Sequence, residues 1–100
     1  MILHGIHLGR PDIAAALRRA GVVRAWVFGS ILTDAFTPAS DIDLLIETDP
    51  AAPAGLLVLG GLQMDLSDLL GRPVHLTLLR GVPSPARESL LHSARQLHAA

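Results

Sequence analysis

Two aspartates, Asp41 and Asp43, are the side chains of this chain best suited to chemistry. Asp43 lies within an apolar run, residues 42–46, that is typical of a strand, where residues two apart point to the same face. The two carboxylates therefore lie side by side and repel each other. A divalent cation removes that repulsion, and Mg²⁺ is usually held by one or two carboxylates with water and substrate phosphates. Taken alone, the pair also fits two solvated carboxylates at the end of a strand.

A glycine-serine turn, Gly29 and Ser30, follows the β-branched and aromatic run of residues 22–28. Glycine lets the backbone turn sharply and approach a ligand closely. Serine at the start of a short helix offers a hydroxyl and backbone N–H groups to a phosphate. The order of strand, Gly-Ser, Ser-Asp-Ile-Asp and apolar strand places an anion cradle beside a metal-binding pair. The sequence therefore predicts a nucleoside triphosphate site.

Hydrophobic periodicity and chain breakers predict the elements that position this site. Helices are expected over residues 11–20, 31–36, 53–70 and from Ser84 towards the C-terminus, and strands over 22–28, 41–46 and 74–79. In the last helix the apolar stripe comprises Ala86, Leu90, Leu91, Ala94 and Leu97. The pair Gly60-Gly61 indicates either close packing against another backbone or a local kink. The length and element order favour one α/β domain over residues 1–100.

Composition narrows the function classes. Eight basic against nine acidic residues give no electrostatic footprint for direct DNA binding. Every basic residue is arginine, which excludes a phosphate loop that needs lysine, and the lack of cysteine excludes disulfides, zinc-thiolate sites and cysteine nucleophiles. The opening residues are too short and interrupted for a signal peptide, and no apolar run reaches membrane-spanning length. We expect a cytoplasmic protein with some apolar surface reserved for a partner.

Two motifs, Val27–Ser30 and Pro38–Ile46, resemble the minimal nucleotidyltransferase (MNT) family of the polymerase-β-like superfamily. Residues 60–66, 69–74 and 86–91 resemble later parts of that family. The resemblance implies a nucleotidyltransferase fold, a small mixed sheet flanked by helices. It also implies Mg²⁺, with Mn²⁺ as an alternative, on Asp41 and Asp43, and a nucleotide at Gly29, Ser30 and Ser40.

The resemblance further implies a reaction and a partner. An acceptor hydroxyl would attack the α-phosphorus of a nucleoside triphosphate, with AMP from ATP the expected transferred group. MNT proteins often act as antitoxins paired with all-helical HEPN toxins, so the acceptor would be a hydroxyl, such as that of a tyrosine, on a HEPN-type partner. A homodimer is a further expectation.

Two departures from the family pattern put activity in question. His75 stands where active members place a third carboxylate, and its roles remain open between general base, ligand for manganese, nickel or zinc, and remnant of a lost site. The segment Ile31–Asp34 replaces an arginine-bearing run and removes positive charge from the phosphate site. Two hypotheses follow: an enzyme using Asp41, Asp43 and His75, or a catalytically degenerate binding module that neutralises a partner by contact.

The remaining aromatic and imidazole side chains are expected to be structural. Trp26 and Phe28 fit core positions of the first predicted strand, with stacking on a base as the minor alternative. The other histidines form no closed metal set, because such sites need three or four converging ligands. We therefore expect them at the surface or rim: His4, His7, His92 and His98.

Overall fold

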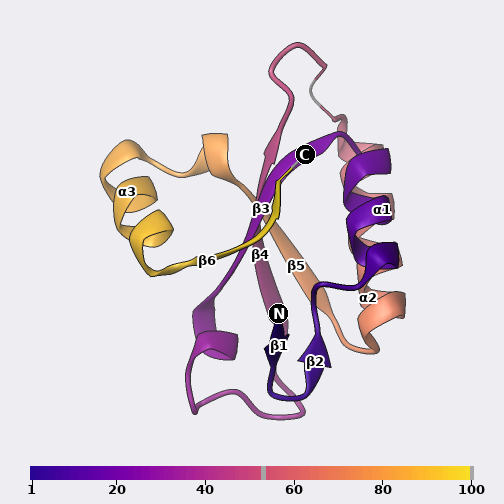
Figure 1. The fold of residues 1–100 in the computed structure, drawn as a ribbon. Coiled ribbons are helices and arrows are strands. Elements are labelled where there is room, and N and C mark those ends of the chain that lie inside the picture. The colour runs from indigo at the N-terminus through magenta and orange to yellow at the C-terminus, as the bar shows by residue number, and fades with distance from the viewer. Residues whose placement is uncertain (53, 100) are drawn as a thin grey trace.

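The computed structural model describes residues 1–52 and 54–99 and shows a mixed sheet flanked by helices. In chain order the elements are β1 (Ile2–Leu3), β2 (Ile6–His7), α1 (Pro11–Arg19), β3 (Val22–Phe28), the 3-10 turn η1 (Gly29–Leu32), β4 (Ile42–Thr48), α2 (Leu56–Leu70), β5 (Val74–Leu78), the 3-10 turn η2 (Leu79–Gly81), α3 (Ser84–Ser93) and β6 (Arg95–Ala99). The main sheet has the order β5-β4-β3-β6, in which only β4 and β5 are parallel (Figure 1). The fold class expected from the sequence is confirmed.

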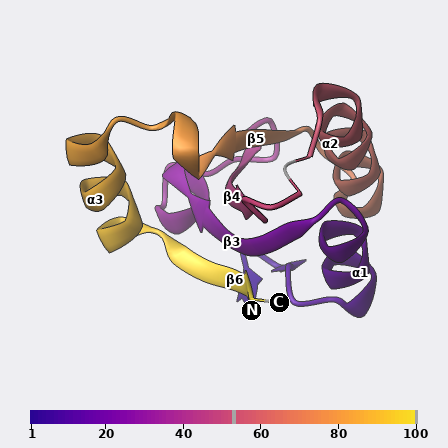
Figure 2. The same cartoon turned by 90° about the horizontal axis from the view of Figure 1, so that it is seen from above.

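The two faces of the sheet are covered unequally. Helices α1 and α2 lie on one face and α3 lies on the other, as both views show (Figures 1 and 2). The larger core lies between the sheet and α1 with α2, and a smaller cluster of Trp26, Leu45 and Leu79 lies towards α3. The inward side chains of β4 predicted from alternation, Ile42, Leu44 and Ile46, are fully buried. Alternation then turns Asp43 towards the α3 face.

Most predicted elements are present with small shifts of their ends. α1 begins at Pro11, and Gly21 follows it with a φ of +79°. The predicted start of the long helix at Pro53 lies outside the described residues, and α2 begins at Leu56. The third strand ends at Leu78, because Leu79 begins η2. Within residues 1–52 and 54–99, no helix is long and apolar enough to cross a membrane.

The predicted last helix is wrong beyond Ser93. Ala94 is extended, with φ −72° and ψ 156°, and the chain continues as β6, antiparallel to β3. The stripe through Ala94 and Leu97 has helical spacing, but the open edge of β3 offers backbone hydrogen bonds that a helix would leave unused. Long-range pairing therefore overrides the local pattern.

The predicted helix over residues 31–36 is also wrong. The segment forms only the 3-10 turn η1, and Thr33 ends it in an extended conformation. The Thr33 hydroxyl donates to the Ser30 carbonyl oxygen at 2.8 Å, a local side-chain bond that competes with helix continuation. The N-terminal hairpin of β1 and β2 was not anticipated. At Gly60 and Gly61 an added Cβ would meet no atom within 4 Å, so close packing within the chain does not explain these glycines.

Two side chains of α2 accept hydrogen bonds from backbone N–H groups on the outer edge of β5. The Ser67 hydroxyl donates to the Gln63 carbonyl oxygen and accepts from the Val74 N–H, at 2.7 and 3.0 Å. The Gln63 side chain accepts from the Leu76 N–H at 3.3 Å. These bonds tie α2 to the strand that carries His75 and occupy edge amides that another strand would pair with.

Ser67→Ala is expected to lower the free energy of unfolding by about 1–2 kcal/mol, because the part-buried Val74 N–H loses its acceptor. Urea denaturation followed by circular dichroism measures the change. Ser89→Ala on α3 is the matched control, because Ser89 is exposed and alanine has the same helix propensity advantage there. Equal midpoints for the two variants would show that the Ser67 bond contributes nothing.

Candidate functional site

The turn after β3 lies directly against Asp43. Phe28, the last residue of β3, pairs with Asp43 on β4, so Gly29 enters its turn beside that carboxylate. Gly29 has a φ of +81°, and a Cβ added there would lie 2.7 Å from Asp43 Oδ2. Ser30 follows at the start of η1. The close approach of turn and carboxylate therefore depends on glycine at this position.

The parallel pairing of β4 with β5 brings His75 into the same group. Asp43 is in register with His75, and His75 Nε2 lies 2.8 Å from Asp41 Oδ2. The side chains of His75 and Asp41 are 57% and 43% exposed, so the pair is open to solvent and ligand. Because a carboxylate accepts, Nε2 carries the hydrogen, and Nδ1 is the nitrogen left to take a proton.

Asp43 is the carboxylate of the pair whose ionised form the folded chain disfavours. Burial raises the pKa of Asp43 above its ordinary value, His75 partly offsets this, and the neighbouring Asp41 charge raises it further. The ionised form is thus held at a cost in the protein alone. A bound cation would relieve that cost.

The donor set fits a magnesium ion held partly by its substrate. Asp41 and Asp43 supply hard carboxylate oxygens, the ligands Mg²⁺ prefers. Among the residues that the structure describes, no three histidine, aspartate or glutamate side chains converge closely enough to hold a metal ion. Within the described residues His75 therefore does not complete a three-ligand site, and a metal ion held here would take at most these two carboxylates, with water and phosphate as its other ligands.

Ser40 lies at the start of the aspartate motif, but its hydroxyl is engaged locally. Ser40 Oγ accepts from the Thr37 N–H at 2.9 Å and lies 3.2 Å from Thr37 Oγ1. It closes the turn that leads into Asp41. Of the predicted nucleotide-binding residues, the structure thus places Gly29 against Asp43, with Ser30 next in the chain, and shows Ser40 in a structural bond.

Two residues that sequence reasoning did not assign to the site hold the loop over residues 31–40. Arg72 Nη1 donates to the carbonyl oxygens of Thr37 and Ser40, each at 3.2 Å, and its guanidinium lies 4.6 Å from the centre of the Phe36 ring. His4 donates from Nε2 to the Ile31 carbonyl oxygen at 3.0 Å, and its ring also packs on Phe36. For Arg72 the signal in the sequence was its place in the Gly71-Arg72-Pro73 break, and no signal in the sequence indicated the contact of His4.

The expectation that His98 is a surface residue is wrong. His98 lies on β6 with only 8% of its surface exposed, and within the described residues its Nε2 has no hydrogen-bond partner. The position follows from the missed strand, because His98 pairs with the fully buried Ala25 of β3. His4, His7 and His92 are exposed, as expected.

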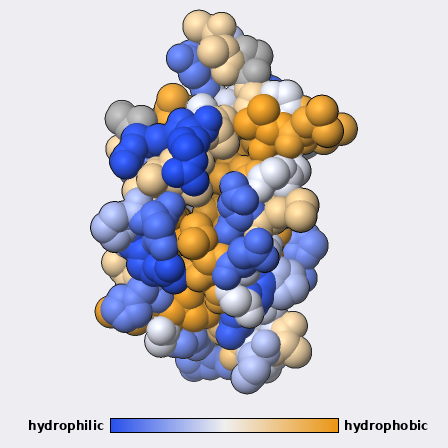
Figure 3. Space-filling model, turned by 90° about the vertical axis from the view of Figure 1, so that its right-hand side faces the viewer, coloured by the Kyte–Doolittle hydropathy of each residue, from blue (hydrophilic) through white to orange (hydrophobic). Residues whose placement is uncertain are grey.

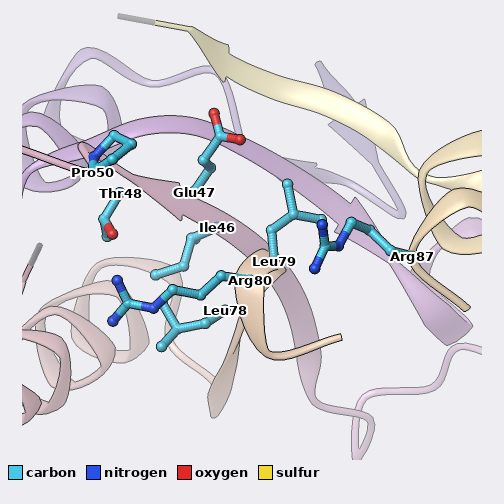
Figure 4. Close-up of a pocket in the computed structure, with 8 residues that line it drawn as sticks. All are labelled: Ile46, Glu47, Thr48, Pro50, Leu78, Leu79, Arg80 and Arg87. Atoms are coloured by element: carbon cyan, nitrogen blue, oxygen red, sulfur yellow. The ribbon is translucent and has the colours of Figure 1, made fainter. Parts of the chain in front are cut away.

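A separate cavity of about 340 Å³ lies near the other end of β4. Its lining residues, shown in Figure 4, are Ile46, Glu47, Thr48, Pro50, Leu78, Leu79, Arg80 and Arg87. Glu47 is paired with Arg24 at 2.7 and 2.9 Å, and Arg87 donates to the Val82 carbonyl oxygen. The lining does not include Asp41, which precedes β4, or Asp43, the second residue of β4, so the carboxylate site and this cavity are distinct.

Solved structures with the same fold are nucleotidyltransferases and antitoxins. A minimal nucleotidyltransferase structure is 33% identical, with a TM-score of 0.71 and 82% of each chain covered. A toxin-antitoxin structure with AMP-PNP is 22% identical, with a TM-score of 0.71, over 89% of this chain and 72% of the other. A tri-AMPylated HEPN toxin with its MNT antitoxin, from Shewanella oneidensis, is 21% identical, with a TM-score of 0.63, over 88% and 67%.

The comparisons by sequence give a clear assignment. No curated protein matches this chain. The nucleotidyltransferase domain family matches residues 11–98, a span that contains the Gly29 turn, both aspartates and His75. With that span and the 33% identity to a minimal nucleotidyltransferase, the chain belongs to the nucleotidyltransferase domain family.

Proposed function

We propose that this chain binds ATP with Mg²⁺ and transfers AMP to a hydroxyl group on a HEPN-type protein partner, as an antitoxin. The observation that carries the proposal is the close contact of the Gly29 turn with Asp43, because it brings a turn suited to phosphates next to a carboxylate suited to a metal ion. Support also comes from the fold shared with an antitoxin complex holding AMP-PNP and with an MNT antitoxin bound to an AMPylated HEPN toxin.

In this proposal the chain mainly positions the reactants. Asp41 and Asp43 hold the metal ion, which when bound neutralises charge on the transferring phosphoryl group. Gly29 admits the phosphates, and Ser30 offers them its hydroxyl. His75 fixes the orientation of Asp41 through the 2.8 Å bond.

The chemistry is a displacement at phosphorus. The acceptor oxygen forms a bond to the α-phosphorus, the bond to the bridging oxygen breaks, and pyrophosphate leaves. The acceptor hydroxyl gives up its proton, and Nδ1 of His75 is the nitrogen able to take it. The exposure of His75 and Asp41 is consistent with an acceptor that arrives on another protein.

Isothermal titration of the purified chain with ATP tests the binding step, with Mg²⁺, with Mn²⁺ and with chelator. The proposal expects binding that needs the metal. Incubation with ATP labelled at the α-phosphate and a purified HEPN-type partner then tests transfer, with label expected on the partner. If ATP binds neither with Mg²⁺ nor with Mn²⁺ present, the proposal is refuted.

A second candidate function is a partner-binding module that has lost transfer. The bond from His75 to Asp41 favours it, because it occupies an oxygen of a proposed metal ligand where a third carboxylate would add one. The apolar segment Ile31–Leu32 beside Ser30 supplies no positive charge for the triphosphate. In this case the partner is neutralised by contact alone.

His75→Asp separates the two candidates. A third carboxylate beside Asp41 is expected to tighten Mg²⁺-dependent ATP binding about tenfold, since it adds a hard oxygen ligand. AMP transfer should fall if His75 takes the proton, and should appear or rise if the site is degenerate. His92→Asp, an equal charge change on exposed α3, is the control in both assays. Unchanged ATP affinity in His75→Asp would place the metal away from this residue.

A further inference from the structure

Helix α2 exposes an unusual amount of apolar surface. Leu56, Leu57, Val58 and Met64 are 87, 92, 47 and 69% exposed, and only Leu62 and Leu66 of this helix are fully buried. In Figure 3, which faces the α1 and α2 side, apolar atoms project near the top and continue downwards between hydrophilic side chains. A helix that is apolar around most of its circumference is normally covered on more than one side.

One exposed face of α2 carries the apolar side chains of Leu57 and Met64. Leu57, Gly61, Met64 and Asp68 have the spacing of one helix face, turned away from the buried Leu62. Between Leu57 and Met64 the surface is flat, because a Cβ added at Gly60 or Gly61 would meet nothing within 4 Å. Each of these glycines costs about 1 kcal/mol against alanine in a helix, and the chain's own packing does not require them.

The charges flanking this face are separated along the helix. α1 and α2 run antiparallel: Arg10 donates to the Leu69 carbonyl oxygen at one end, and Ala20 shares a groove with Leu57 at the other. Arg19, exposed at the end of α1, lines the same groove as Leu57 and therefore lies beside the start of α2. The exposed Asp65 and Asp68 lie in its last half. The face is thus positive at one end, negative at the other and apolar between.

We propose that this face is a two-fold interface with a second copy of the chain, with α2 packed antiparallel against α2 of the second copy. The two-fold rotation places Leu57 of each copy on Met64 of the other, with the glycine pairs at the centre. It also brings the acidic half of each α2 towards the basic end of the other copy. A surface whose two ends carry opposite charges complements itself in this arrangement, and an isologous contact needs that property.

The interface does not depend on the proposed transfer reaction. α2 covers the sheet face opposite to α3 (Figures 1 and 2). Asp43 and His75 alternate with Leu44 and Leu76, which pack in the core under α1 and α2, so they lie on the α3 side of β4 and β5. Two copies joined through α2 would therefore leave both carboxylate sites open. Dimer formation is expected without nucleotide, metal or partner protein.

Sedimentation equilibrium of the purified chain in chelator tests the proposal. The chain is expected to show a concentration-dependent monomer-dimer equilibrium, which Leu57→Asp weakens at least about 100-fold, since each dimer buries this leucine twice. The variant should remain folded, because Leu57 is 92% exposed and an acidic residue in the first turn suits the helix dipole. Ile2→Asp is the matched control, as Ile2 is 58% exposed on β1.

A charge exchange tests the antiparallel arrangement itself. Arg19→Glu, and separately Asp68→Arg, should each weaken the dimer, and the two changes together should restore it. A monomer at every concentration would overturn the proposal, including the case in which the face binds only a helical partner protein. So would a dimer that survives Leu57→Asp, or a double variant Arg19→Glu/Asp68→Arg whose dimer is weaker than that of both single variants.

Discussion

Asp43→Asn is expected to weaken Mg²⁺-dependent ATP binding at least about 100-fold while raising the thermal stability of the metal-free protein at pH 7. The loss follows because the amide removes one of only two carboxylates at the proposed metal site. The gain follows because burial and the neighbouring Asp41 make the ionised Asp43 costly in the folded chain. One substitution should therefore move function and stability in opposite directions.

The pH dependence of stability gives this prediction its sign. The folded-state pKa of Asp43 is raised above the ordinary value of 3.8, so the folded protein holds this proton more tightly than the unfolded chain. That contribution to stability is present below 3.8 and is lost as the pH rises through the raised pKa. This loss contributes to the fall of the thermal unfolding midpoint as the pH rises. In Asp43→Asn that contribution to the fall should be absent.

Calorimetric scans in chelator at several pH values, with ATP titrations in Mg²⁺, measure both effects. Glu88→Gln on exposed α3 makes the same change in net charge and should alter neither. A variant of Asp43 that is less stable at pH 7 would show that the carboxylate is stabilised by its neighbours. A variant that keeps metal-dependent binding would remove Asp43 from the metal site.

The central part of the site could be predicted because its determinants are local. The spacing of Asp41 and Asp43 predicted that they lie together, and both contact or pair with His75, Asp41 from just before β4 and Asp43 from within it. The burial of Leu44 and its neighbours follows the predicted strand period. The turn at Gly29 could be predicted because a glycine that ends an apolar run typically marks the end of a strand and the start of a turn. The register that sets His75 beside Asp41 is a tertiary fact, although alternation did turn His75 away from Val74.

The parts that were not predicted depend on contacts between distant segments. The helical spacing of apolar residues in α3 continues through Ala94 to Leu97 of β6, and only pairing with the edge of β3 makes this segment a strand. Arg72 reaches the loop before Asp41 across 32 and 35 positions, and His4 reaches Ile31 across 27. The residue types arginine and histidine do not predict such contacts, since both are common at protein surfaces.

Gly29→Ala is expected to weaken metal-dependent ATP binding about 100-fold, a loss that backbone strain alone does not produce. Alanine at a φ of +81° costs about 1–2 kcal/mol in stability, and its Cβ would lie 2.7 Å from Asp43 Oδ2, so the carboxylate must move. A displacement of about 1 Å in a catalytic group can cost about 100-fold.

Gly21→Ala provides the matched control at the other end of β3. Gly21 has a φ of +79°, and its added Cβ would meet only the Ala52 carbonyl oxygen at an ordinary 3.9 Å. Both variants should lose similar stability in urea denaturation. Only Gly29→Ala should lose ATP affinity in isothermal titration, and equal affinities would show that the Gly29 turn takes no part in binding.

The double variant decides how Gly29 acts. If alanine at this position works by displacing the Asp43 carboxylate, then adding Gly29→Ala to Asp43→Asn should cost little further ATP affinity, because the group it displaces no longer holds the metal. If the turn instead contacts the phosphates independently, the two losses should add. The stabilities should be close to additive in either case, because strain at a φ of +81° does not depend on the charge of its neighbour. If the losses in ATP affinity are not additive but the losses in stability are, then Gly29 acts on binding by allowing the Asp43 carboxylate to keep its position at the proposed metal site.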